Sequence, residues 1–384
     1  MMLKIPFVKI YLTGKENQNI SQISTLCGDG FFSHQCNQWL EDKLNCIKSL
    51  LTPSCTAALE MAALLMNLKP GDEVIMPSYT FPSTANAFAL RGAKPVFIDI
   101  RADTLNLDET LIESAITEKT KAIVAMHYAG VSCEMDTIIR IAKKYNLYIV
   151  EDAAQAILAK YKGRFLGTLG DFGAYSFHET KNITCGEGGA LLLNNPNFID
   201  LAEIIREKGT NRSNFYRGVV DKYTWQHLGS SYLLSELNAA FLSAQLEQAE
   251  FIKQKRLAFW NIYHEGFSEL EHLGVVRRPI IPAECEHNAH SYYLLVADVE
   301  KRDKVIAYLT QKGIMAVFHY IPLHNSPAGK VFTRTQGDLK HTEATSKKIL
   351  RLPLFMDMND NMLHEIIETT KEALLTCEVT SGKK

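Results

Sequence analysis

The sequence contains no long apolar run. No window approaches the roughly 18 apolar residues that a membrane-spanning helix requires. The first twenty residues carry Lys4 and Lys9 inside their apolar stretch, whereas a signal peptide needs an unbroken apolar run of about 7–15 residues. We therefore expect a cytoplasmic protein with no membrane partner.

Closely spaced cysteines and an excess of basic charge are also absent. The 8 cysteines are scattered, with no CxxC pair and no spacing typical of a metal site, which indicates reduced thiols rather than a disulfide framework. The formal net charge is −2, so no overall basic field attracts nucleic acid. We expect no metal ion and no nucleic-acid partner, and any anion must be bound at a local site.

The chain also lacks internal repeats, low-complexity segments and a GxGxxG motif after its first strand-like segment, which disfavours a nicotinamide dehydrogenase. Its 384 residues predict roughly two domains. Between about residues 50 and 195, short apolar runs alternate with helical patterns. Expected helices cover 56–68, 83–93, 108–116 and 135–146, and expected strands cover 71–78, 94–100, 121–128 and 147–153. Apolar strands separated by helices indicate an α/β fold with a mostly parallel sheet covered on both faces.

The second half of the chain has a different pattern. Residues 170–194 read as two short strands joined by a glycine-rich turn. One long helix is predicted over about 235–267, with Ser235 as its N-cap. The segments HSYYLLVADV and IMAVFHYI read as short strands of a smaller C-terminal α+β domain. We predict a large domain with an N-terminal arm over 1–250 and a small domain over 251–384, linked by the long helix.

Three segments carry side chains that could take part in catalysis or bind a cofactor. V-E-D-A-A-Q places Asp152 at the end of an apolar strand, S-F-H-E-T-K places Lys181 before G-E-G-G, and P-S-C-T-A-A places Thr56 and Ala57 at a helix start. Taken singly, each has an ordinary explanation. Such an acid is more often a helix cap, such a lysine is usually solvated, and a Ser/Thr cluster normally caps its helix.

Taken together, the three segments match what pyridoxal phosphate (PLP) requires. This cofactor needs a lysine that binds it covalently and an acid opposite its ring nitrogen. Its phosphate is best held by amides and hydroxyls at a helix N-terminus, and Ser176 adds a hydroxyl. The sequence therefore predicts a PLP site.

The order P-S-C-T-A-A-L, P-S-Y-T-F, V-E-D-A-A-Q, S-F-H-E-T-K-N and G-E-G-G-A resembles the DegT/DnrJ/EryC1/StrS sugar aminotransferases, from about residue 5 to the C-terminus. The resemblance implies a PLP-dependent transferase fold of type I, with Lys181 as the Schiff-base lysine and Asp152 paired with the ring nitrogen. It further implies other cofactor contacts: Gln155 on the ring hydroxyl, Phe81 stacked on the ring, and Thr56, Ala57 and Ser176 on the phosphate.

One segment departs from the family pattern. Members often carry G-x-N-Y-R, whose Asn reaches the phosphate in the neighbouring subunit, whereas this chain reads G-S-S-Y-L with Ser231 at that position. The resemblance implies a homodimer or a dimer of dimers. A serine hydroxyl is shorter than the Asn side chain, so the cross-subunit contact is an open question.

The segments LCGDGFFSHQC, REKGTNRSNFYRGVVDKYTW and VFHYIPLH resemble family members that act on dTDP-4-dehydro-6-deoxy-D-glucose. Such enzymes transfer the amino group of L-glutamate to C4, giving dTDP-4-amino-4,6-dideoxy-D-galactose and 2-oxoglutarate for a cell-surface polysaccharide (enterobacterial common antigen or O-antigen). Candidate contacts to the dTDP-keto sugar are Arg212, Arg217, His319, Tyr320 and His324. A solvated loop is about as good an explanation for the two arginines.

Three alternatives stay open to different degrees. Amination at C3, or with another stereochemistry, is compatible with every motif above. Members that dehydrate a deoxy sugar carry His where this chain has Lys181, which disfavours dehydration. A non-catalytic regulator or scaffold is disfavoured because the lysine, the acid and the phosphate cup occur together.

Overall fold

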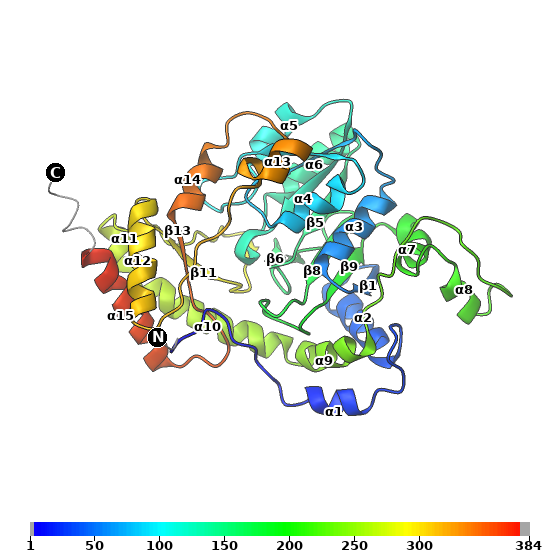
Figure 1. The fold of residues 1–384 in the computed structure, drawn as a ribbon, viewed down its shortest axis with the longest axis horizontal. Coiled ribbons are helices and arrows are strands. Elements are labelled where there is room, and N and C mark those ends of the chain that lie inside the picture. Colours follow the sequence, from blue (N-terminus) through cyan, green and yellow to red (C-terminus); the bar gives the residue numbers. More distant parts are fainter. Residues whose placement is uncertain (1–3, 377–384) are drawn as a thin grey trace.

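A computed structural model describes residues 4–376. Its centre is an eight-stranded sheet in the order β1-β9-β8-β5-β4-β2-β3-β12 (Figure 1). The strands are β1 (Lys48–Thr52), β2 (Glu73–Pro77), β3 (Lys94–Ile98), β4 (Thr120–Met126), β5 (Tyr148–Asp152), β8 (Phe172–Ser176), β9 (Gly189–Leu193) and β12 (Arg334–Thr335). All pairs from β12 to β8 are parallel, and β9 pairs antiparallel with both β8 and β1. The predicted α/β fold with a mostly parallel sheet is therefore confirmed.

Helices cover both faces of this sheet, because successive strand residues point to opposite sides and both sides are apolar. On β4, Ile123 faces a cluster that includes residues of α2, α6 and α9, and Val124 faces a cluster that includes residues of α3, α4 and α7. The helices of this part are α2 (Phe31–Leu44), α3 (Cys55–Leu65), α4 (Pro82–Ala89), α5 (Ile112–Ala115), α6 (Met135–Tyr145) and α7 (Ile199–Arg206).

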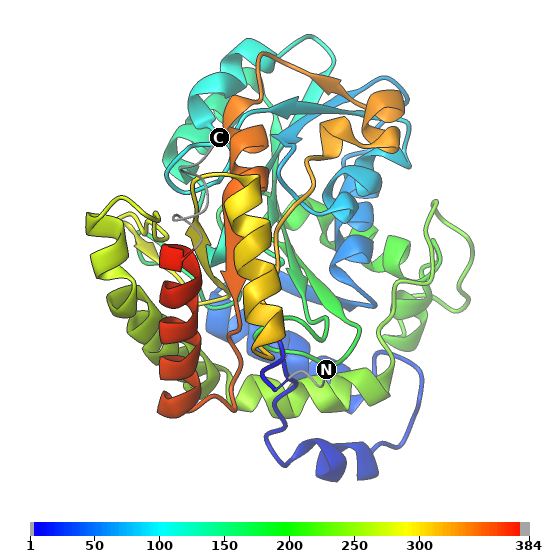
Figure 2. The ribbon, with the colours of Figure 1, turned by 60° about the vertical axis from the view of Figure 1, so that its left-hand side comes forward.

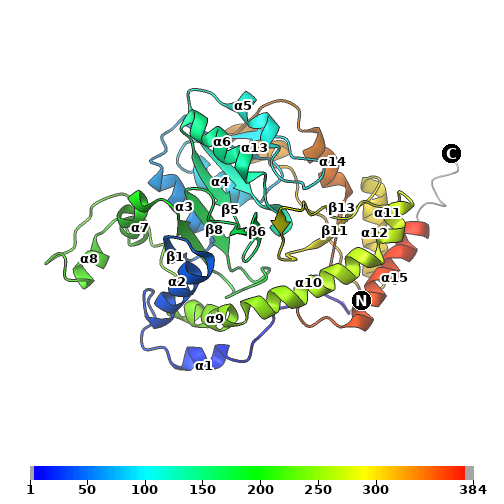
Figure 3. The same ribbon diagram turned by 180° about the vertical axis from the view of Figure 1, so that it is seen from behind.

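The predicted single helix over 235–267 is wrong, because the segment forms two helices. These are α9 (Glu236–Glu247) and α10 (Ala249–Gly266), separated at Gln248, whose φ of −101° and ψ of 7° leave the helical region. Figure 3 shows the pair as one bent rod beneath the sheet. The bend lets α9 pack into the core of the large sheet while α10 packs its C-terminal half into a separate core. Ser235 caps α9 as predicted, accepting from the amide of Asn238 at 3.4 Å.

The C-terminal part surrounds its own apolar cluster, built from α10, α11, α12, α15 and a two-stranded sheet, with Ile5 of the N-terminal arm inserted. In Figure 2, α12 and α15 lie side by side in front of this sheet. Its elements include α11 (Ser268–His272), β11 (Tyr292–Leu295), α12 (Val299–Gln311), α13 (Pro327–Phe332), α14 (Lys340–Lys348), β13 (Ile349–Leu352) and α15 (Asp360–Thr376). The domain boundary at 250/251 stays a prediction, and β12 returns from this part to pair with β3.

The strand expected in IMAVFHYI is also wrong. Only single bridges form there, from Ile314 to Ile5 and from Val317 to Arg351. The following residues leave the sheet because the side chains of His319 and Tyr320 turn into a pocket, where other side chains hold them. The strand predicted over 290–299 is confirmed in its centre as β11.

The remaining elements are short: α1 (Glu16–Ser21), β6 (Lys160–Tyr161), β7 (Arg164–Phe165), α8 (Arg212–Tyr216) and β10 (Cys285–Glu286). The segment around α8 projects from the body beyond α7 (Figures 1 and 3). Within residues 4–376, no helix combines the length and apolar character needed to cross a membrane. The cysteines in this range are free thiols.

Candidate active site

A cavity of about 560 Å³ lies where β5 and β8 end and α3 begins. Open α/β sheets bind ligands at the carboxyl ends of their strands, and this volume lies in the usual range for cofactor and small-molecule sites. Its walls come from the arm, the large sheet and the C-terminal part. The lining side chains include Phe7, Thr56, Phe81, Thr84, Asp152, Gln155, Ser176, Lys181, Arg256, His290, Ser291, His319, Tyr320 and Arg351.

Lys181 lies in the loop between β8 and β9, in a turn closed by its own amide, which donates to the carbonyl of His178 at 2.9 Å. The side chain lines the cavity. Burial lowers its pKa from the ordinary value, with the Arg351 charge acting in the same direction, while Cys55 and Asp152 oppose the shift. The amine is therefore more readily neutral than a surface lysine, as a nucleophile or base requires.

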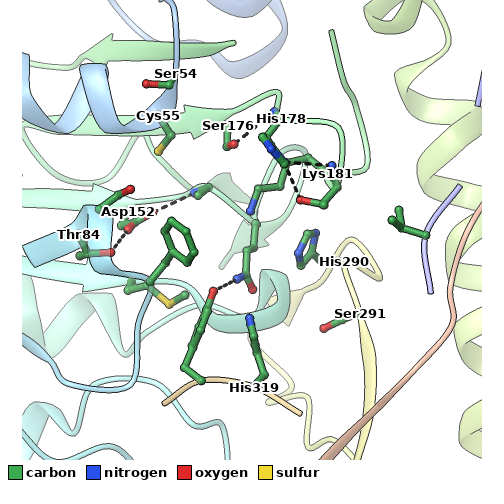
Figure 4. A pocket seen from close by; sticks show the side chains of 18 of the residues that line it. Ser54, Cys55, Thr84, Asp152, Ser176, His178, Lys181, His290, Ser291 and His319 are labelled. Atoms are coloured by element: carbon green, nitrogen blue, oxygen red, sulfur yellow. Dashed lines mark hydrogen bonds between the residues drawn. The ribbon is translucent and has the colours of Figure 1, made fainter. Parts of the chain in front are cut away.

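Asp152 is the last residue of β5 and is only 5% exposed. Its Oδ2 accepts from the hydroxyl of Thr84 at 2.6 Å, and its Oδ1 accepts from the amide of Ala154 at 3.2 Å. Figure 4 shows Asp152 and Lys181 on opposite sides of the pocket interior. The acid and the amine thus face the same space without pairing with each other.

The neighbouring Glu151 explains why the end of β5 is rigid. It points away from Asp152, is fully buried, and accepts hydrogen bonds from four donors: the amides of Gly167, Leu169 and Gly170 and Nε2 of His127. The amide of Cys133 donates to Nδ1 of that histidine, so Nε2 carries the hydrogen. A buried carboxylate needs such full satisfaction, and the network fixes the strand from which Asp152 extends.

The start of α3 forms the third part of the site. Ser54 caps the helix by accepting from the amide of Ala57 at 3.1 Å, and Thr56 donates to the hydroxyl of Ser83 at 2.7 Å. Gly189 makes this arrangement possible, because a Cβ there would lie 2.5 Å from the backbone nitrogen of Cys55. With Ser176 on the same wall, the helix N-terminus and its hydroxyls suit a phosphate group.

Aromatic side chains line the other wall. Phe81 is 58% exposed and borders the cavity, with its ring centroid 6.4 Å from that of Tyr320. Gln155 accepts from the amide of Ala129 at 2.7 Å and donates to the hydroxyl of Tyr320 at 2.8 Å. Both polar atoms of Gln155 are thus engaged, and its expected contact with a ring hydroxyl stays a prediction.

His319 lines the cavity beside this aromatic wall. The hydroxyl of Tyr128 lies 2.9 Å from its Nδ1, and burial lowers its pKa well below the ordinary value. Its imidazole is therefore neutral at physiological pH.

Other residues expected at the site lie elsewhere in this chain. Nδ1 of His324 lies 2.7 Å from the hydroxyl of Ser78, outside the cavity lining. Arg212 and Arg217 lie at α8 and its C-cap, where they pair with the acidic side chains Glu207 and Glu203. Ser231 is exposed and bridges to the backbone of Glu207. Their roles in the site remain predictions. For Arg212, Arg217 and Ser231, these roles would require a second subunit.

Several lining residues were not predicted from the sequence. Thr84 stands within the motif P-S-Y-T-F-P-S-T, and its spacing of three from Phe81 is the one signal available in advance. Phe7, His290 and Arg351 lie in segments with no distinguishing motif. Only the folded chain brings them to the cavity.

These residues fit PLP: an amine of lowered pKa, a carboxylate held across the cavity, and a helix N-terminus beside hydroxyls. The model of the DegT/DnrJ/EryC1/StrS aminotransferase family matches residues 21–371. MJ1066 of Methanocaldococcus jannaschii, an uncharacterized protein, is 38% identical over 83% of this chain and 84% of its own length. The spore coat polysaccharide biosynthesis protein SpsC of Bacillus subtilis is 33% identical over 83% of each chain.

Among solved structures, the putative sugar aminotransferase Spr1654 of Streptococcus pneumoniae, in its PMP form, superposes with a TM-score of 0.90. The two share 28% identity over 99% of this chain and 100% of that one. The same protein has been solved in a PLP form. The chain thus has the PLP-dependent aminotransferase fold with PLP as its cofactor, and it belongs to the DegT/DnrJ/EryC1/StrS aminotransferase family.

Proposed function

We propose that the chain is a cytoplasmic dTDP-4-amino-4,6-dideoxygalactose transaminase. It would convert dTDP-4-dehydro-6-deoxy-D-glucose and L-glutamate to dTDP-4-amino-4,6-dideoxy-D-galactose and 2-oxoglutarate, for synthesis of a cell-surface polysaccharide. The observation that carries the proposal is the placement of Lys181 and Asp152 on opposite sides of one open cavity. Family membership supports a sugar as the amino acceptor, and the segment likeness described above supports this particular sugar.

The chain's own residues would divide the work as follows. Thr56, Ala57 and Ser176, at or near the start of α3, would hold the phosphate of PLP, and Phe81 would cover one face of its ring and exclude water. Bound PLP supplies an electron sink that makes the carbon–hydrogen bond beside the reacting nitrogen acidic. Lys181 would hold the cofactor covalently through its side-chain amine.

With its amine free, Lys181 would act as a general base and acid, taking a proton from the donor carbon and returning it within the site. Burial lowers its pKa, which favours the neutral amine that accepts this proton. Asp152, fixed by Thr84, keeps the ring nitrogen protonated through charge pairing. Lys181 would thus move the proton of the donor carbon, and Asp152 would hold the proton on the ring nitrogen.

Assembly would complete the site. A two-fold dimer of the obligate class, burying well over roughly 2,000 Å², would bring Ser231 of one subunit toward the phosphate cup of the other. The projecting segment around α8 carries several exposed aromatic side chains: Phe215, Tyr216, Tyr223 and Trp225. Aromatic side chains in a projecting segment are typical of an interface core. In that dimer Arg212 and Arg217 would approach the nucleotide diphosphate of the partner's substrate.

The test is product identification. Purified protein with PLP, L-glutamate and dTDP-4-dehydro-6-deoxy-D-glucose should yield an amino sugar, detected by mass spectrometry and assigned by NMR as the 4-amino galacto isomer. The Lys181→Ala variant is the control that must give no turnover. Amination at C3, or the other configuration at C4, would reject the assigned product while leaving the aminotransferase assignment intact. A purified protein that binds no PLP would favour the regulator or scaffold.

A further inference from the structure

His290 is a buried histidine in the cavity wall to which the proposed reaction assigns no role. It stands just before β11 and is 8% exposed. Its backbone amide donates to Oδ1 of Asn288 at 3.1 Å, and its carbonyl accepts from the guanidinium of Arg256 at 2.8 Å. The fold therefore fixes the position of this residue independently of any ligand.

Asn288 anchors the turn that carries His290. It is 1% exposed, and its side-chain amide donates to two backbone carbonyls in the loop after β5, each at 2.9 Å. Its own carbonyl accepts from the side-chain amide of Asn182 at 2.9 Å. Asn182 directly follows Lys181 in the chain. The turn is thus tied to the loop that carries the reacting amine, so His290 keeps a fixed place relative to it.

The same asparagine decides which nitrogen of the His290 ring carries the hydrogen. Nδ2 of Asn182 donates to a carbonyl, which can only accept, so its Oδ1 is the atom that faces the ring. Nδ1 of His290 lies 3.2 Å from that oxygen and must therefore be the donor. Burial lowers the pKa of His290 well below the ordinary value, and the charge of Lys181 adds to the shift. The ring is neutral, with a hydrogen on Nδ1 and none on Nε2.

The bare Nε2 opens to the cavity. Among residues 4–376 no group forms a hydrogen bond with this nitrogen, and it is not enclosed by protein atoms. By contrast, the acceptor oxygens of Asp152 and Gln155 already receive hydrogen bonds from protein donors. His290 therefore presents the cavity with an uncharged acceptor that has no partner in this part of the chain.

A free acceptor restricts which ligand group can pair with it. The phosphate of PLP and the carboxylates of an amino-acid donor are acceptors themselves, whereas a sugar hydroxyl is a donor. The charge of Lys181 contributes to the pKa shift of His290, so the two side chains lie near each other. Figure 4 shows both in the part of the pocket away from Asp152. The ligand hydroxyl must therefore lie near the reacting carbon.

In dTDP-4-dehydro-6-deoxy-D-glucose one hydroxyl stands next to the reacting C4. It is attached at C3, because C5 carries the ring oxygen and the C6 methyl group. We propose that Nε2 of His290 accepts a hydrogen bond from this C3 hydroxyl, and that Asn182 is the positioning residue that keeps the accepting nitrogen bare. The contact would select keto sugars with a hydroxyl beside the carbonyl and hold the carbonyl carbon near Lys181. This inference rests on the proposed function, since it requires a keto sugar as amino acceptor.

The experiment compares two acceptors reacting with the aminated enzyme, the keto sugar and its 3-deoxy analogue. The second-order rate constant of wild type should be at least about tenfold higher for the keto sugar, because the analogue leaves Nε2 unpaired. In His290→Leu the constant for the keto sugar should fall by at least about tenfold and that for the analogue should stay within about threefold, so the preference disappears. His290→Gln should recover part of the preference, because its amide oxygen can accept.

The donor half of the reaction is the internal control. L-Glutamate offers no sugar hydroxyl, so His290→Leu should react with it within about threefold of the wild-type rate. His264→Leu is the matched control, since His264 also has a ring nitrogen without a partner but lies outside the cavity lining. It should keep the wild-type preference between the two sugars. Equal melting temperatures and PLP content exclude misfolding of the variants.

Three kinetic results would overturn the proposal. Equal losses with both sugars in His290→Leu would show that the residue acts through packing. Equal losses with L-glutamate and with the keto sugar would show that it acts on Lys181. An unchanged preference between the sugars would show that the C3 hydroxyl does not contact it.

Nitrogen NMR of the PLP-loaded enzyme with isotope-labelled histidine tests the tautomer without any sugar. The His290 signals, identified by their loss in His290→Leu, should show a hydrogen on Nδ1 and none on Nε2. A hydrogen on Nε2 would also overturn the proposal. Failure of the wild type to aminate this keto sugar would instead reject the proposed substrate, and a bare Nε2 in the spectrum would still support His290 as an acceptor. The two hypotheses therefore fail in distinguishable ways.

Discussion

The hydroxyl of Thr84 donates a 2.6 Å hydrogen bond to Oδ2 of Asp152, joining the start of α4 to the end of β5. Thr80 lies 2.7 Å from the same hydroxyl and donates to it, since the Thr84 hydrogen is already used. The two threonines form a short relay of donors onto one buried carboxylate. This relay fixes the orientation of the Asp152 carboxyl group, which we propose to pair with the ring nitrogen of the cofactor.

Asp152→Asn tests that electronic role. We expect a yellow protein with near-normal PLP affinity, whose reaction with L-glutamate is slowed by at least about a hundredfold, because a transition-state electrostatic contact is lost. Stopped-flow absorbance beside a thermal melt gives both quantities. Thr84→Val, which removes one donor and keeps the carboxylate, should slow the reaction less. An unchanged rate with only a lowered melting temperature would show that Asp152 is structural.

Lys181 should make the stability of the cofactor-free protein depend on pH. Its folded-state pKa is lowered below 10.5 by burial, so the unfolded chain binds a proton that the folded chain holds less well. The lysine therefore costs stability below pH 10.5, and this cost disappears as the pH rises through that value. Lys181→Met should raise the melting temperature at about pH 8, and the gain should shrink toward the unfolded-state pKa, the ordinary lysine value.

Scanning fluorimetry of apoprotein across this pH range measures the effect. Lys222→Met, a change at an exposed lysine outside the cavity, is the control and should give no pH-dependent difference. A gain for Lys181→Met that stays constant with pH would argue that removing the amine acts by packing alone.

Gly189→Ala should damage the phosphate cup. The added Cβ would lie 2.5 Å from the nitrogen of Cys55 and 2.6 Å from the carbonyl oxygen of Ser54, backbone atoms that move only if the helix start moves. We expect PLP affinity to fall by at least about tenfold, as one or two cup contacts are lost. Absorbance titration of apoprotein measures it.

The matched control for this change is Gly163→Ala. That glycine has open space around its Cβ position and a φ of +78°. Alanine there should cost roughly 1 kcal/mol of stability through backbone strain and leave PLP affinity unchanged. Equal affinity losses in both variants would mean that the cup is not the cause.

Subunit mixing tests whether Ser231 acts across a dimer interface. Lys181→Ala and Ser231→Trp variants, each inactive alone, are unfolded and refolded together. Half of the resulting dimers are hybrids, and one of the two sites in each hybrid carries neither substitution. Activity should therefore return to roughly one quarter of wild type for a two-fold dimer. Absence of recovery would place Ser231 in the same site as Lys181 of its own chain, and an active Ser231→Trp variant on its own would place Ser231 outside the site.

The sequence alone determined the layered α/β fold and indicated the pair of residues, Lys181 and Asp152, for which we propose catalytic roles. Strands that are apolar on both faces require a parallel sheet that is covered on both sides. The pattern of apolar residues in the sequence was therefore sufficient to predict the fold. Lys181, Asp152 and Thr56 were recognisable because each stands at a strand end or helix start, where local geometry already points its side chain toward one edge of the sheet.

Tertiary structure decided what local pattern could not. The helical segment bends at Gln248 because α9 packs into the core of the large sheet and the C-terminal half of α10 packs into a separate core. No proline or glycine marks this position in the sequence. His319 and Tyr320 leave their expected strand because the cavity, not a neighbouring strand, satisfies their side chains. Arg351 came to the site through strand pairing with β11, far away in sequence. Among residues 4–376 its Nε is buried without a hydrogen-bond partner beside the cavity, an environment that exists only once the chain has folded around it.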